Sequence, residues 1–420
     1  MTLNSNEIRS QFPSLQRKDI FFDNPGGTQI ARHSLERMQR YLLECNANHE
    51  GAFRTSRESD AVLHEARAAM ADFLNAPSPE EIVFGNNMTT ITFNMARALQ
   101  ARLGSGDEIV VTRLDHDANI SPWLLTAQDR GSRVTWVDFD VEDGTLKVDE
   151  FERAMARKPK LVAFGLASNA LGTINPARRL IEMARRAGAL VYVDAVQYAP
   201  HGPIDVRDLD CDFLVCSSYK FFGPHAAALY GRMDLLQDLK PYKVRPASNA
   251  APYKFETGTQ NHEGIAGMLG AVEYFEWLGE TFGDAADWRE SGFTGRKLAL
   301  KQAMSAIRAY EFELSRGLIE AIGSVPGTRI YGLTDLKRLE ERVPTVSFTM
   351  DGIAPRRLAE RLAEEGFYTW DGNYYALAVT ERLALEERGG MLRVGAVHYN
   401  TLDEVMRLRE ALNKIAKSRN

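Results

Sequence analysis

Cysteine is scarce in this sequence: its 420 residues include only Cys45, Cys211 and Cys216. Because the number is odd and no two of them form a C-x-x-C pair, the sequence argues against a disulfide framework or a zinc site and favours a reducing compartment. The longest apolar run, around residues 161–170, contains Gly, Ser and Asn and is too short to span a bilayer. The first residues lack the apolar segment of a secretory signal. We therefore expect a cytoplasmic protein that does not enter a membrane.

An excess of charge of either sign is also missing. The chain has 51 basic and 57 acidic residues, a formal net charge of −6. This balance offers no electrostatic footprint for nucleic acid or an anionic membrane. Basic pairs such as Arg178-Arg179 and Arg185-Arg186 recur at helical spacing, which is typical of a solvated helix face. The sequence contains no G-x-G-x-x-G after its first strands, no P-loop and no H-E-x-x-H, which argues against a dinucleotide oxidoreductase and a bound metal.

The composition, 44% hydrophobic and 26% charged, is that of a globular protein. Between about residues 80 and 232, short β-branched runs alternate with helical patterns. The expected strands are 108–112, 133–138, 161–167, 190–193 and 213–216, and the expected helices are 120–130, 148–157 and 177–187. Such alternation predicts an α/β fold with a mostly parallel sheet and helices on both of its faces.

The pattern changes after Gly264. A long helical region, about 265–322, is broken near Gly283 and precedes a smaller α+β unit. The strands expected in this unit are 345–350, 367–369 and 392–397, and its helices are 354–365 and 402–416. Since a chain of this length exceeds one small core, we expect a large domain over 22–285 and a small α+β domain built from 1–21 and 286–420.

Polar residues follow three of the expected strands, where ligands bind in parallel sheets. Asp194 ends one strand, Lys220 follows the next, and Asn169 follows a third. Taken singly, Asp194 and Lys220 suit a helix cap or a solvated position, and Asn169 suits a turn. Together they match pyridoxal phosphate (PLP), which needs a lysine amine for a Schiff base and a carboxylate that keeps the pyridine nitrogen protonated. Burial of Lys220 would lower its pKa and make it a better nucleophile, and Asn169 and Gln197 suit donation to the phenolate oxygen.

Two further segments suit the same cofactor. Thr89 and Thr90 precede the amphipathic run 91–103, and a helix N-terminus there would favour a phosphate. A Thr N-cap explains the same residues without a ligand. His116 follows the strand that ends at Thr112. Its imidazole could lie flat on the pyridine ring and relay protons, or it is a surface histidine.

Four segments resemble the class V aminotransferases of PLP fold type I, most of all the cysteine desulfurase and selenocysteine lyase group. They are Asp194-Ala-Val-Gln197, Ser217-Ser-Tyr-Lys220, Ser168-Asn-Ala-Leu-Gly-Thr173 and the run from Arg393 to Thr401. The resemblance extends over nearly the whole chain, from Phe22-Asp23-Asn24 to Tyr399-Asn400-Thr401. It implies a mostly parallel seven-stranded sheet in the large domain, PLP as the cofactor and an amino acid as the substrate.

The resemblance also assigns roles to residues. The residues that it implies for the cofactor are Lys220, Asp194, His116, Gln197, Asn169, Thr89, Thr90, Ser217, Tyr219 and Thr259. Lys220, Asp194 and His116 are the implied catalytic residues, and Thr259 would reach the phosphate of the opposite subunit, which implies a homodimer with a shared active site. Arg393 would bind the substrate α-carboxylate bidentately, unless it forms a surface ion pair.

One departure from the family pattern bears on the reaction. Desulfurases of this group carry a cysteine nucleophile near the segment 370–376, where this sequence has Tyr375. A phenol cannot accept sulfur as a persulfide, so we expect a lyase-type reaction at Cα or Cβ without one. Tyr374 and Tyr375, with Trp370, suit an aromatic lid over a different substrate side chain, or packing of the small domain. An aminotransferase, a true desulfurase or selenocysteine lyase, and a non-catalytic PLP-binding protein are the alternatives.

Overall fold

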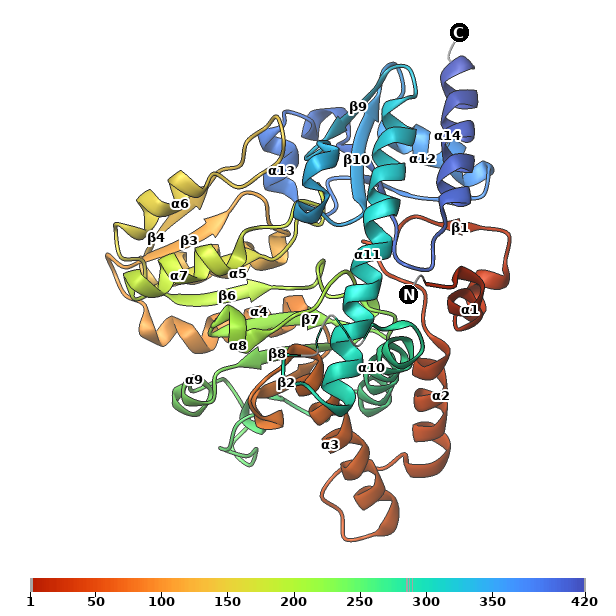
Figure 1. The fold of residues 1–420 in the computed structure, drawn as a ribbon. Helices are drawn as coiled ribbons and strands as arrows, with labels where there is room; N and C mark the ends of the chain where they lie inside the picture. The colour runs from red at the N-terminus through yellow and green to blue at the C-terminus, as the bar shows by residue number, and fades with distance from the viewer. Residues whose placement is uncertain (1–2, 285, 287, 289, 419–420) are drawn as a thin grey trace.

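The centre of the molecule is a seven-stranded sheet in the computed structural model, which describes residues 3–284, 286, 288 and 290–418 (Figure 1). Its strand order is β2-β8-β7-β6-β5-β3-β4. The strands are β2 (Ile82–Gly85), β3 (Glu108–Thr112), β4 (Arg133–Val137), β5 (Leu161–Gly165), β6 (Leu190–Asp194), β7 (Phe213–Ser217) and β8 (Ala227–Gly231). All neighbours are parallel except β8, which runs antiparallel to both β2 and β7. The predicted mostly parallel α/β sheet is therefore confirmed.

Helices cover both faces of this sheet, because successive side chains of each strand enter two different hydrophobic cores. Ile109 and Val111 of β3 pack with α4 (Met88–Leu99) and α5 (Ser121–Arg130). Val110, between them, packs in the core that holds α6 (Val148–Met155) and α7 (Ala177–Ala187). Gly188 ends α7 in a left-handed conformation, as expected of a C-terminal glycine.

A group of longer helices packs beside the sheet. It consists of α2 (Arg32–Arg40), α3 (Arg54–Leu74) and α10 (His262–Phe282), the last of which contacts both of the others. Gly270 permits the close approach of α10 to α2, because a Cβ there would collide with the backbone of His33 and Ser34. The expected long helical region is thus two helices, α10 and α11 (Gly295–Gly323), separated where the break was expected.

The C-terminal part of the chain forms a second, smaller layer around an antiparallel sheet of order β12-β13-β10-β9. Its strands are β9 (Thr328–Tyr331), β10 (Thr345–Met350), β12 (Trp370–Gly372) and β13 (Met391–Gly395). The helices α11, α12 (Pro355–Glu364) and α14 (Leu402–Lys417) pack on it around one core. The expected boundary after residue 285 and the two chain ends fall on residues outside those described.

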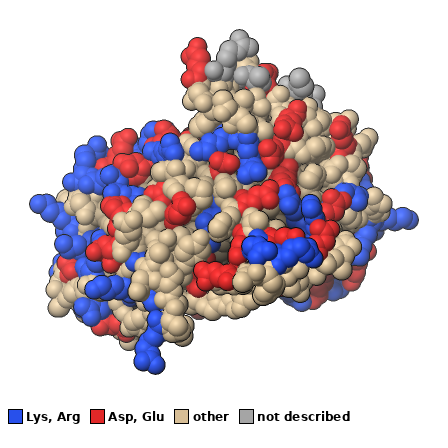
Figure 2. All heavy atoms as spheres, turned by 90° about the horizontal axis from the view of Figure 1, so that it is seen from below, with Lys and Arg blue, Asp and Glu red and all other residues tan. Residues whose placement is uncertain are grey.

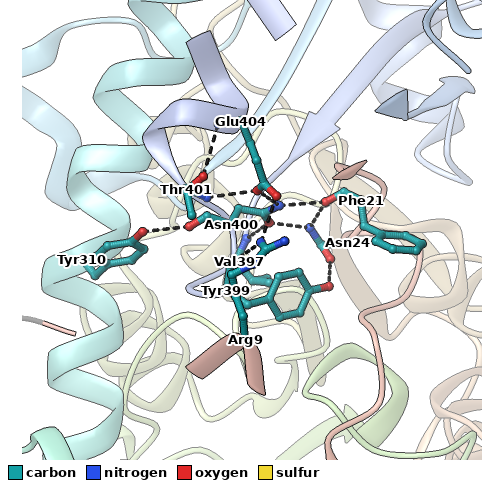
Figure 3. Close-up of polar contacts among 9 residues, drawn as sticks. All are labelled: Arg9, Phe21, Asn24, Tyr310, Val397, Tyr399, Asn400, Thr401 and Glu404. Atoms are coloured by element: carbon teal, nitrogen blue, oxygen red, sulfur yellow. Dashed lines mark hydrogen bonds and ion pairs between the residues drawn. The ribbon is translucent and has the colours of Figure 1, made fainter. Parts of the chain in front are cut away.

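The N-terminal segment is fastened to this second layer (Figure 3). Strand β1 (Ile20–Phe21) pairs in parallel with β11 (Phe367–Tyr368). The Asn24 amide then donates to the Gly395 carbonyl at 2.7 Å and to the Asn400 side chain at 3.1 Å, and the Tyr399 hydroxyl donates to Asn24. Glu404 accepts from Asn400 at 3.0 Å within the capping box that begins α14. These bonds hold residues 21–24 in place, so that Pro25 and Gly26 lie at the edge of the large sheet.

Basic and acidic side chains do not separate into patches on the lower face of the molecule (Figure 2). Figure 2 presents the face seen from below in Figure 1, where basic and acidic side chains are intermixed. None of the helices in the described residues has the length and apolar character needed to cross a membrane.

Candidate active site

A cavity of about 730 Å³ opens at the carboxyl ends of the parallel strands, between the large sheet and the second layer. The expected site residues that line it are Thr89, His116, Asn169, Asp194, Gln197, Ser217, Tyr219, Lys220, Tyr375 and Arg393. Thr90 and Thr259 do not line it. The convergence follows from topology, because β5, β6 and β7 are parallel and each ends at this edge.

Lys220 lies in a 3₁₀ turn, Ser218–Lys220, directly after β7. Its ammonium donates to the Pro25 carbonyl and lies 4.7 Å from the centre of the Tyr219 ring. Burial, followed by the positive charge of Arg393, lowers the Lys220 pKa to about 7. A large fraction of this amine is therefore neutral near pH 7, as a nucleophile or a base requires.

Asp194 closes β6 at the floor of the same cavity. One of its oxygens accepts from the Val196 backbone N–H at 2.8 Å, and within the described chain the other has no partner. Burial raises the Asp194 pKa to about 6. A ring N–H placed on the free oxygen would stabilise the carboxylate, so this residue fits the pyridine nitrogen of PLP.

His116, Asn169 and Gln197 surround these two groups with fixed orientations. His116 Nδ1 accepts from the Ala118 N–H at 3.0 Å, which places its proton on Nε2, and burial lowers its pKa to about 4. Asn169 Nδ2 donates to the Tyr374 carbonyl at 2.9 Å, and Gln197 Nε2 donates to Thr345 at 3.1 Å. Each amide keeps a second N–H, so both can still donate to a phenolate.

The start of α4 has the donors that a phosphate needs. Asn87, not a threonine, is the N-cap, and its side chain accepts from the Thr90 N–H at 2.8 Å. The Ser217 hydroxyl accepts from the Met88 N–H at 3.1 Å, whereas the Thr89 N–H has no partner among the residues described. Thr89 and Ser217 thus fit a phosphate at a helix N-terminus.

Thr90 and Thr259 lie elsewhere. Thr90 lines a smaller cavity beside Phe255 and Gln260, and its backbone N–H is bound by the Asn87 side chain. The expected contact of Thr90 with a phosphate therefore stays a prediction. Thr259 is exposed on the loop before α10.

Arg393 is buried, so its interpretation as a surface ion pair is wrong. Its guanidinium lies 4.4 Å from the centre of the Tyr374 ring and donates to the Asn169 carbonyl at 2.8 Å. Its Nε has no hydrogen-bond partner, and no carboxylate of the described residues forms an ion pair with it. Burial lowers its pKa to about 10, which leaves the group charged at neutral pH. A buried cation of this kind is costly unless an anionic ligand completes it.

The loop after β12, which contains Tyr374 and Tyr375, packs into the protein interior and also lines the cavity. Tyr374 and Tyr375 have φ values of 57° and 58°, a conformation that costs free energy for aromatic residues. The Asp117 N–H donates to the Tyr375 carbonyl at 2.6 Å and holds the loop against the cavity. The Tyr374 ring is buried, whereas the Tyr375 ring is exposed and stacks on His116, with ring centres 5.5 Å apart.

None of the three cysteines lines the cavity. Cys45, Cys211 and Cys216 are all buried, and burial raises the pKa of each thiol, that of Cys216 to about 12. A thiol in this state is a poor nucleophile. Among the described residues, no three or more His, Cys, Asp or Glu side chains come together in a way that could hold a metal ion.

Some residues at the cavity were not anticipated from the sequence. Asp115 and Asp117 flank His116, and His225 stacks on Tyr219 with ring centres 4.9 Å apart. Burial raises the Asp115 pKa to about 8, and the Thr112 hydroxyl donates to its carboxyl group at 2.6 Å. In the sequence, the signal for these carboxylates is the run Asp115-His116-Asp117, which follows a strand end.

Comparisons with known proteins agree with this architecture. The sequence matches the family described as "Aminotransferase class-V" over residues 20–290 and 293–408. It is 32% identical to the "Aminotransferase-like protein FGM3" of Gibberella zeae over 97% of both chains. It is also 32% identical to a "Cysteine desulfurase" of Synechococcus elongatus, over 97% of this chain but only 63% of that longer protein. The apo structure of a cysteine desulfurase from Thermococcus onnurineus NA1 superposes with a TM-score of 0.88, at 26% identity, over 99% of this chain and all of that one.

Proposed function

The chain belongs to the class V aminotransferase family and has the PLP fold type I of cysteine desulfurases, and from this premise we propose a PLP-dependent lyase-type reaction at Cα or Cβ of an α-amino acid, without a persulfide on the protein. The observation that carries the proposal is the composition of one cavity. It combines Lys220, Asp194 and the buried, unpaired Arg393, and it contains no cysteine.

The substrate would be recognised first by its carboxylate. The Arg393 guanidinium is fixed by the Asn169 carbonyl and the Tyr374 ring, and its Nε remains free. A planar fork fixed in this way suits an α-carboxylate, which can accept two parallel hydrogen bonds from it. Binding there would place Cα between Arg393 and Lys220.

Bound PLP supplies an electron sink that stabilises negative charge at the substrate Cα. Asp194 would hold the proton on the pyridine nitrogen, and Lys220 Nζ would take up or deliver the proton at Cα. His116, neutral because burial lowers its pKa to about 4, would orient the reacting groups without adding charge. Trp370 in β12 and Tyr375 in the loop that follows it both line the cavity and would limit the access of water.

Cysteine desulfurase activity is the second candidate, because several similar proteins carry that name. It requires a thiolate that attacks the substrate sulfur. The Tyr375 hydroxyl cannot replace a thiolate, and Cys216 lies within β7 with its pKa raised to about 12. These facts support a reaction that ends with a small product rather than with sulfur on the protein.

An amino-acid panel on the PLP-loaded protein tests the proposal. We expect keto acid and ammonia from at least one α-amino acid that has a leaving group at Cβ, and no trapped persulfide with L-cysteine, because no thiol reaches the cavity. Products would be measured by mass spectrometry and the cofactor by its absorbance. Variants Cys45→Ser, Cys211→Ser and Cys216→Ser are the matched controls and should retain activity.

Other outcomes contradict the proposal in distinguishable ways. Stoichiometric alanine together with a persulfide on one of the three cysteines would establish a desulfurase. Stoichiometric keto acid with conversion of the cofactor to its amine form, and no free ammonia, would establish an aminotransferase.

We also propose that the active unit is a homodimer in which Thr259 reaches the partner's phosphate. Thr259 is exposed in its own chain, and large apolar side chains are exposed near the ends of α2 and α3 and just before α10: Leu42, Leu43, Phe53 and Tyr253. Mixing a Lys220→Ala protomer with a Thr259→Ala protomer should restore part of the activity, because one of the two sites in the heterodimer lacks both defects. Full activity of a monomer at assay concentration would contradict this arrangement.

A further inference from the structure

One carboxylate at the cavity takes no part in the proposed chemistry and, within the described chain, keeps one oxygen without a hydrogen bond. The Asp, His, Lys and Arg residues that line it are Asp115, His116, Asp117, Asp194, Lys220, His225 and Arg393. Lys220, Asp194 and Arg393 are assigned to the cofactor and the α-carboxylate. Asp115 is buried, and its two oxygens accept from Thr112 and Asn119. Asp117 is the remaining carboxylate.

Asp117 is oriented by its neighbours but not neutralised by them. The Ser121 hydroxyl donates to one of its oxygens at 2.5 Å, and within the described chain the other oxygen has no partner. No Lys, Arg or His of the described residues forms an ion pair with it. Its backbone N–H binds the Tyr375 carbonyl at 2.6 Å, so this carboxylate and the aromatic loop are joined at the cavity wall.

Two aromatic rings that line the same cavity are open to a ligand. Tyr375 is 74% exposed and Trp370 is 52% exposed, although both line the cavity. The other two tyrosines of the cavity already face cations: Tyr219 faces Lys220 at 4.7 Å, and Tyr374 faces Arg393 at 4.4 Å. No cation of the described chain is recorded over Trp370 or Tyr375. Trp370 also lies near the carboxylate-binding group, because a Cβ on Gly26 would be 3.8 Å from both its ring and the Arg393 guanidinium.

We propose that the substrate is an α-amino acid whose side chain carries a positive charge, an ammonium or a guanidinium group, bound between the Asp117 carboxylate and the rings of Trp370 and Tyr375. A carboxylate beside aromatic faces attracts cations by charge and by the ring quadrupole. Glu386 lines an adjoining cavity of about 280 Å³ that shares Trp370 and Tyr375, which adds negative charge at the same mouth, whereas Asp371 in that cavity is paired with Arg356 at 3.3 Å. This inference rests on the proposed function, since it names the side chain of that substrate.

A competing role for Asp117 is structural. It stands in the first turn of the 3₁₀ helix Asp117–Asn119, just before α5, where an acidic residue also stabilises the helix terminus. A helix-stabilising residue would affect all ligands equally. A side-chain-binding residue would affect only cationic ones, so the test compares ligands of equal size and different charge.

The test titrates PLP-loaded protein with L-lysine, L-arginine and the uncharged L-norleucine, following the cofactor absorbance. None of the three has a leaving group at Cβ, so the titration measures binding. We expect the dissociation constants of the cationic amino acids to be at least about 10-fold lower than that of norleucine, because the carboxylate and the aromatic rings attract the positive charge. Asp117→Asn should remove this preference by weakening the binding of the two cationic ligands. Asp117→Glu should restore part of it.

Two controls separate the possible failures. Asp129→Asn removes the same charge from the exposed far end of α5 and should retain the wild-type preference. Calorimetric titration of the borohydride-reduced protein, which cannot react, measures binding alone and should show the same loss in Asp117→Asn.

The results that would overturn the inference are specific. Norleucine bound or converted as well as lysine by the wild type would exclude a cation site, and an equal loss for all three ligands in Asp117→Asn would make the residue structural. If no amino acid changes the absorbance or yields product, the proposed function fails, and the calorimetric preference still decides whether the side-chain site exists.

Discussion

The Asp194→Asn variant is expected to bind PLP but to convert its amino-acid substrate about 10³-fold more slowly than the wild type. The phosphate donors at α4 and the amine of Lys220 remain, so binding is retained. The lost carboxylate is the group that would keep the pyridine nitrogen protonated, and this proton acts on charge that develops only in the transition state. The measurement is kcat on the best substrate of the panel, with PLP content determined after denaturation.

Folding of this variant can be verified independently. Burial raises the pKa of Asp194 to about 6, so at pH 8 the protein without cofactor carries an unfavourable buried charge. Asparagine removes that charge, and the cofactor-free variant should unfold at a temperature no lower than the wild type at pH 8. The exposed Asp208→Asn is the matched control for kcat. A wild-type kcat in Asp194→Asn would assign Asp194 some other role.

The Lys220→Ala variant is expected to lose covalent attachment of PLP and at least about 10⁴-fold in kcat, because one amine supplies both the Schiff base and the proton transfer at Cα. After borohydride reduction, peptide mapping should find the cofactor on Lys220 in the wild type and on no lysine in the variant. Lys301→Ala is a poor control because Lys301 is itself buried, so the exposed Lys240→Ala serves instead. Cofactor on a different lysine would contradict the assignment.

The pH dependence of PLP capture gives the same prediction a second readout. The neutral amine is the nucleophile, and burial with Arg393 lowers the Lys220 pKa to about 7. The rate of capture by cofactor-free protein should therefore rise about tenfold per pH unit below pH 7 and level off above it. A free lysine derivative should keep gaining rate up to about pH 10. A protein profile that follows the free amine would show that burial does not tune Lys220.

The sequence was a good guide to the parallel part of the fold. Strands such as β3 and β5 are buried on both faces and form continuous apolar runs, so the predicted strand ends between residues 108 and 217 fall within two residues of those observed. The antiparallel strand β8 was missed because Ala-Ala-Leu-Tyr-Gly has no β-branched residue. Strand β12 is three residues long and was missed because it depends on pairing with β13.

The same contrast holds for the site. Lys220, Asp194 and Asn169 were predictable because parallel strands deliver their ends to one edge. The contact between Asp117 and Tyr375 could not be predicted from the sequence. It depends on two consecutive tyrosines in a left-handed conformation, which tertiary contacts impose. Pro25 was missed for a similar reason: its position depends on the bonds of Asn24 to residues near the other end of the chain.

The fastening of Asn24 to Asn400 has a consequence for biosynthesis. Pro25, which binds the Lys220 ammonium, emerges from the ribosome early, whereas Asn400 and Arg393 are made some 370 residues later, which at roughly 5–20 residues per second is a delay on the order of 20–75 s. Through most of this interval residues 20–24 lack the second-layer partners that hold them. The cavity is therefore complete only after Asn400 has been made, and PLP cannot meet its full set of contacts before that point.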